Sequence, residues 1–113
     1  MPKHLPYRAV TASGNQFEFE FPLHPETAST VDVFNLLSAV LATLDHEIRQ
    51  IGSVSNGDVL QAVAMALAVR TRILPGNRDA LAGLASRLLT DALAAPVLAA
   101  PSNLAAGEPR DVH

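Results

Sequence analysis

The sequence contains no cysteine and no tryptophan, and its only lysine is Lys3. The lack of cysteine excludes a disulfide framework, a thiolate zinc site and a thiol nucleophile. A single lysine close to the chain end is a poor candidate for the desolvated lysine of Schiff-base chemistry. There is also no glycine-rich phosphate-binding loop and no Gly-x-Ser-x-Gly nucleophile motif. These absences argue against most common classes of enzyme.

Charge and hydropathy argue against two classes of partner. Eight basic and eleven acidic residues give a formal charge of −3, which offers little support for binding a nucleic-acid backbone. The longest nearly unbroken apolar run, residues 59–69, is far shorter than the roughly 20 residues that cross a bilayer. The first residues contain no apolar signal core. We therefore expect a cytoplasmic, bacterial-type protein without a nucleic-acid or membrane partner.

The residues that are present are typical of one small, mostly helical domain. Of the 113 residues, 49% are hydrophobic and only 4% are aromatic. Because alanine and leucine dominate, helices are favoured over a β-sandwich. We expect a single domain over residues 1–100. In residues 101–113, proline, glycine, small and charged residues follow one another without periodicity, which predicts a disordered tail.

An alternation of apolar and acidic residues predicts a β-hairpin over residues 7–21. Such a period of two is typical of a strand with one buried and one solvent-exposed face. The apolar members of the alternation are Phe17, Phe19 and Phe21.

A three-residue turn gives this hairpin the most consistent pairing. It places Tyr7 opposite Phe21 on the apolar face and Arg8 opposite Glu20 on the other face, where the charges are complementary. This turn predicts a left-handed conformation for Asn15.

Three helices are expected, over residues of about 30–51, 56–74 and 77–95. The first has an apolar stripe at three- and four-residue steps and ends before Gly52. The second is apolar all round, so we expect it to be buried on most of its sides. The predicted fold is therefore α+β, with an N-terminal β-hairpin packed on a three-helix bundle. A purely helical fold is the alternative if the hairpin is irregular.

The densest cluster of chemically active side chains is Asp45-His46-Glu47. Consecutive helical residues point about 100° apart, so these three side chains cannot converge on a ligand by themselves. Asp45 is better placed for an i, i+4 ion pair with Arg49. A polar site around His24, His46 and Glu47 would need the fold to bring them together. It is the basis of the alternative function, a small-ligand or metal-dependent module; otherwise no catalytic residue, metal or cofactor is expected.

Apolar surface provides the main functional prediction. A lone two-stranded hairpin leaves two open edges. In a bundle of only three helices, little is available to cover a helix that is apolar all round. A symmetric contact with a second copy would cover both features with one surface. We therefore expect a non-enzymatic interaction or accessory protein that forms a homodimer and acts on an unidentified protein partner. The candidate interface residues are Phe17, Phe19, Phe21, Val63 and Leu67.

Overall fold

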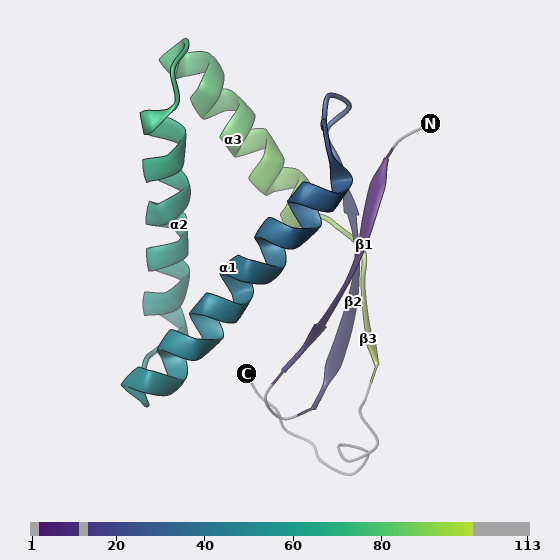
Figure 1. Cartoon of the computed structure of the whole chain (residues 1–113), viewed down its shortest axis with the longest axis vertical. Helices are drawn as coiled ribbons and strands as arrows, with labels where there is room; N and C mark the ends of the chain where they lie inside the picture. Colours follow the sequence, from purple (N-terminus) through teal and green to yellow (C-terminus); the bar gives the residue numbers. More distant parts are fainter. Residues whose placement is uncertain (1–2, 12–13, 101–113) are drawn as a thin grey trace. The chain divides into compact units, whose positions relative to one another are not determined.

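The computed structural model describes residues 3–11 and 14–100 of the chain (Figure 1). The elements in chain order are β1 (His4–Val10), β2 (Gln16–Pro22), α1 (Thr30–Ile51), α2 (Asn56–Ile73), α3 (Arg78–Leu93) and β3 (Val97–Ala100). The predicted α+β class, a hairpin followed by three helices, is confirmed. The predicted tail over residues 101–113 lies outside the described residues.

The chain divides into two compact units. The sheet unit contains the residues up to Thr30 together with those from Asp91 onward, and the helical unit spans Val31–Thr90. All three strands belong to the sheet unit, and most of the helical residues belong to the helical unit. A single domain over residues 1–100 stays a prediction.

The register of the hairpin differs from the predicted one by two residues. Tyr7 lies opposite Phe19 and Arg8 lies opposite Glu18, so each partner on β2 comes two residues earlier than predicted. The shift extends β1 toward the N-terminus and brings Leu5 into the sheet, where it is buried. Because the shift is an even number of residues, the two faces of the hairpin keep their predicted membership.

The turn of the hairpin lies one residue earlier in the chain than predicted, with Thr11 opposite Asn15. The N–H of Thr11 donates to the carbonyl oxygen of Asn15 at 2.9 Å, and the N–H of Gly14 donates to the carbonyl oxygen of Thr11 at 2.9 Å. Gly14 has a φ of 93°, whereas no non-glycine residue described has a positive φ. The prediction of a left-handed Asn15 is therefore wrong. Glycine takes the left-handed position because it has no Cβ to clash there.

A third strand, which the sequence analysis missed, completes the sheet in the order β1-β2-β3. β3 pairs antiparallel with β2, with Leu98 opposite Glu18. The pairing starts where the N–H of Glu20 donates to the carbonyl oxygen of Pro96 at 3.1 Å. The only sequence signal for this strand is a short apolar run between two prolines.

The side chains of the sheet separate into an apolar and a more polar face, because successive residues of a strand point to opposite sides. The apolar face carries Leu5, Tyr7, Ala9, Phe17, Phe19, Phe21, Val97 and Ala99. The rings of Phe19 and Phe21 stack, with centroids 5.0 Å apart and planes 8° apart. Leu5 and Ala95 are the two hydrophobic residues described as buried. The core of the sheet unit is therefore small.

Pro6 lies inside β1 without interrupting the pairing. The N–H of Leu23 donates to the carbonyl oxygen of Lys3 at 2.8 Å, just beyond the start of β1. Since hydrogen-bonded pairs alternate along an antiparallel ladder, the odd-numbered residues of β1 bond to β2. The nitrogen of Pro6 therefore faces the open edge, where its missing hydrogen costs no ladder bond.

Local caps mark the helix ends. The Oγ atom of Ser55 accepts a hydrogen bond from the N–H of Asp58 at 3.1 Å, which caps α2. The Oδ1 atom of Asn77 accepts one from the N–H of Ala80 at 2.8 Å at the start of α3. Gly52, with a φ of 92°, follows the last residue of α1.

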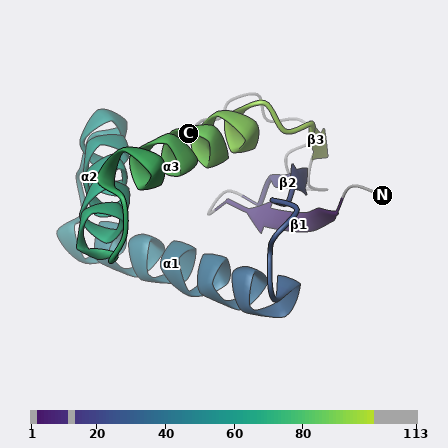
Figure 2. The same ribbon diagram turned by 90° about the horizontal axis from the view of Figure 1, so that it is seen from above.

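None of the three helices buries a residue within the chain. Every α2 residue from Leu60 to Arg70 is exposed. The prediction that the second helix is buried on most of its sides is therefore wrong for the single chain. Figures 1 and 2 show the physical reason, because α1 and α3 meet α2 at its opposite ends and not along its length. None of the described helices has the length and hydropathy needed to cross a membrane.

Candidate interaction surface

Two of the predicted interface residues, Val63 and Leu67, lie one turn apart on the same face of α2. Their exposed fractions are 38% and 39%. Leu60 precedes Val63 by three residues on that face and is 71% exposed. Other apolar residues of α2, Met65 and Val69, are also exposed. The chain buries no residue of this helix, although the apolar composition of the helix predicts burial.

The exposed apolar side chains extend over the whole helical unit. Sixteen large apolar residues between Val31 and Thr90 are exposed, with exposed fractions between 37% and 71%. We call this set the uncovered apolar surface; it comprises Val31, Val33, Phe34, Leu36, Val40, Ile51, Leu60, Val63, Met65, Leu67, Val69, Ile73, Leu74, Leu84, Leu88 and Leu89. Single exposed apolar residues are ordinary, and a set of this size in one small unit is the candidate interaction surface of the protein.

The other predicted interface residues, Phe17, Phe19 and Phe21, are half-buried in the sheet unit. They lie on β2, which is the central strand of the described sheet; all three are paired with β1, and Phe17 and Phe19 are also paired with β3. These rings therefore contribute to the small core of the sheet unit as well as to its surface.

The residues of the predicted polar site are divided between the two units. His24 follows β2 in the sheet unit, where its Nδ1 atom accepts a hydrogen bond from the N–H of Glu26 at 3.0 Å. His46 and Glu47 are exposed residues of α1 in the helical unit. Neither unit by itself contains the predicted polar site, which stays a prediction. The described residues contain no group of three or more histidine and carboxylate side chains that could hold a metal ion.

A different polar group lines a shallow pocket of about 340 Å³ in the sheet unit. Its titratable residues are His4 on β1, Glu20 on β2 and Asp91 on α3, and all three are exposed. Sequence analysis missed this grouping because the three residues lie on elements that are far apart in the chain. Because water reaches each of these groups, the pocket does not provide the desolvated environment that tunes catalytic acids and bases.

No known protein family matches this chain, and neither does any curated protein or solved structure. Its function is therefore inferred from its own residues.

Proposed function

We propose that the protein is a non-enzymatic, cytoplasmic interaction protein whose helical unit associates with a second copy of itself. The observation that carries this proposal is the uncovered apolar surface. A folded chain that leaves this surface in water forgoes much of the hydrophobic stabilisation that its sequence offers. Association recovers that stabilisation without any change in the sequence or the local structure.

The size of the surface agrees with that of a dimer interface. Fully burying one apolar side chain contributes about 1.5–3 kcal/mol, equivalent to roughly 60–120 Å² at about 25 cal/mol per Å². Sixteen side chains that are on average about half exposed would then contribute on the order of 800 Å². Each partner of a standard protein interface contributes about 800 Å².

A second copy is the partner that fits this surface best. α2 is apolar on all sides, so it requires a partner as apolar as itself, and an identical helix meets that requirement. The alanines at positions 62, 64, 66 and 68 allow the axis of a neighbouring helix to approach closely. A two-fold contact also uses one patch twice, so one sequence feature covers both chains.

Sedimentation equilibrium of the full chain tests the proposal. We expect a species of twice the chain mass of 11.9 kDa at micromolar concentrations. A single species at the monomer mass at high micromolar concentration would overturn the proposal. Stoichiometric metal in the purified protein, measured by elemental analysis, would instead favour the alternative module around His24, His46 and Glu47.

Two variants of α2 localise the interface. Leu67→Asp places a charge on the uncovered apolar surface, and we expect it to shift the equilibrium toward monomer because burying an unpaired charge is costly. The matched control is Gln61→Asp, which adds the same charge to the same helix at its one polar position between 59 and 69. If both variants shifted the equilibrium toward monomer equally, the cause would be added charge anywhere on α2, and the interface would not be localised to Leu67.

A further inference from the structure

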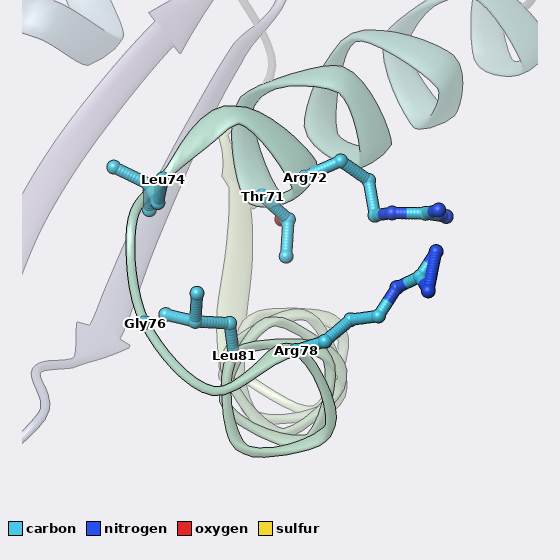
Figure 3. Close-up of a pocket in the computed structure, with 6 residues that line it drawn as sticks. All are labelled: Thr71, Arg72, Leu74, Gly76, Arg78 and Leu81. Atoms are coloured by element: carbon cyan, nitrogen blue, oxygen red, sulfur yellow. The ribbon is translucent and has the colours of Figure 1, made fainter.

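The connection between α2 and α3 borders a second pocket, open to solvent and of about 330 Å³, whose lining residues all belong to the helical unit. It is lined by Thr71, Arg72, Leu74, Gly76, Arg78 and Leu81. Figure 3 shows the two arginine side chains extending to the same side, with their guanidinium groups facing each other. The side chains of Leu74 and Leu81 lie on the opposite side. The pocket, here called the arginine pocket, therefore has a cationic end and an apolar end.

The two guanidinium groups lack a counter-ion in the described part of the chain. Neither takes part in an ion pair or a hydrogen bond there, and the one ion pair described joins other residues. The hydroxyl of Thr71, which donates to the carbonyl oxygen of Leu67 at 2.8 Å, carries no charge and cannot neutralise them. Two like charges thus face each other without neutralisation, which is electrostatically unfavourable.

The helix dipoles make one of these charges less favourable than the other. Arg72 lies in the last turn of α2, where the partial negative charge of the helix end favours a cation. Arg78 is the first residue of α3, where the partial positive charge of the helix end disfavours one. A bound anion between the two guanidinium groups would relieve both the mutual repulsion and the unfavourable position of Arg78.

We propose that the arginine pocket binds a small organic oxyanion, with its charged group between Arg72 and Arg78 and its apolar body against Leu74 and Leu81. Guanidinium groups match the oxygens of carboxylates and phosphates through paired hydrogen bonds, so either charged group fits. The volume of about 330 Å³ lies at the lower end of the range of about 300–1,000 Å³ for small-molecule sites. The ligand is therefore small. The inference rests on the residues of the pocket itself, of which only Leu74 also belongs to the uncovered apolar surface.

Titration calorimetry of the full chain at constant ionic strength tests the proposal with four probes. Phenyl phosphate and benzoate combine an apolar ring with the two candidate charged groups, inorganic phosphate lacks the ring, and benzyl alcohol lacks the charge. We expect saturable binding, with one site per chain, of phenyl phosphate, benzoate or both. The tighter of these two identifies the charged group. Inorganic phosphate should bind at least about tenfold more weakly, and benzyl alcohol should not bind. Absence of saturable binding by both aromatic anions would overturn the proposal.

Charge-neutralising variants assign the binding to the pocket. Arg72→Gln and Arg78→Gln should each weaken binding by about tenfold or more, because each removes one charged hydrogen-bonding partner. Arg70→Gln removes the same charge from α2 at a residue that does not line the pocket, and it should leave affinity within about twofold. All three arginines are exposed, and circular dichroism verifies that the variants fold. An equal loss of affinity in all three variants would show that the anion is attracted by general positive charge, and it would overturn the proposal.

Discussion

Arg8 and Glu18 form an exposed ion pair across the hairpin, with 3.0 Å between Nη2 and Oε2. Their side chains are 61% and 45% exposed, so water screens the attraction. A double-mutant cycle with Arg8→Gln and Glu18→Gln should give a coupling energy of about 0.2–1 kcal/mol in urea unfolding. The same cycle with Glu20→Gln is the control and should give none. Coupling to Glu20 in place of Glu18 would contradict the observed register.

The size of this coupling explains why the sequence predicted the faces of the hairpin but not its register. Arg8 finds a glutamate opposite it in either register, and an exposed pair contributes only about 0.2–1 kcal/mol. The observed register also brings Leu5 opposite Phe21 and buries it, and a fully buried leucine contributes about 1.5–3 kcal/mol. The larger contribution therefore selects the register, and charge pairing alone cannot identify it.

Two glycines with opposite conformational requirements allow a second test. A Cβ atom added at Gly52 or at Gly83 would meet no atom within 4 Å, so the two substitutions do not differ in steric contact with neighbouring residues. Gly52 has a φ of 92°, so Gly52→Ala should lower the free energy of unfolding by about 1 kcal/mol. Gly83 lies inside α3, so Gly83→Ala should raise it by up to about 1 kcal/mol. Urea denaturation measures both.

The two outcomes check each other. If both substitutions lowered the free energy of unfolding equally, backbone conformation would not be the cause. If only Gly83→Ala lowered the free energy of unfolding, a second copy or another segment would have to approach α3 closely at that position, where the single chain leaves open space.

At the scale of elements, β3 is the part of the sheet whose removal is most informative. A chain that ends at Pro96 lacks the strand, so the outward backbone groups of β2 lose their partner and a marginal two-stranded hairpin is left. We expect the free energy of unfolding to fall by about 1–3 kcal/mol, because each of these hydrogen bonds contributes about 1 kcal/mol. A chain that ends at Ala100 keeps the strand and, from its sequence, should match the full chain in thermal denaturation. Equal melting temperatures for both truncations would contradict this role of β3.

The elements that the sequence predicted well are those with local signals. Ser55 and Asn77 cap helices through bonds to residues three positions later, and Gly52 ends a helix through its own backbone freedom. All three signals can be read in a short window of sequence. β3 has only four residues, and the partner that makes it a strand lies near the other end of the chain, so no local pattern contains it.

At the scale of the whole molecule, self-association predicts that thermal stability depends on chain concentration. A hundredfold increase should raise the free energy of unfolding by about 2.7 kcal/mol per dimer, because dilution favours the unfolded monomers. The melting temperature should therefore rise by several degrees in a dilution series followed by circular dichroism. A melting temperature that stayed constant over the series would indicate a folded monomer.

The arrangement of the helices is the part of the structure that sequence reasoning could not provide. Apolar periodicity identifies α2 and marks Val63 and Leu67 as residues that should avoid water. It does not say whether the same chain or another one buries these residues, and here the chain buries no residue of α2. The residues of the predicted polar site are divided between the two units for a related reason, since His24 and His46 have no local relation in the sequence.

Pro6 also affects how a further strand could pair with the open edge of β1. The N–H groups of His4, Arg8 and Val10 face outward along this edge, and Pro6 interrupts them because proline has no N–H. A strand of another molecule that paired there would keep one carbonyl group without a ladder hydrogen bond. A single imino acid in the first strand therefore weakens any continuation of the sheet at this edge.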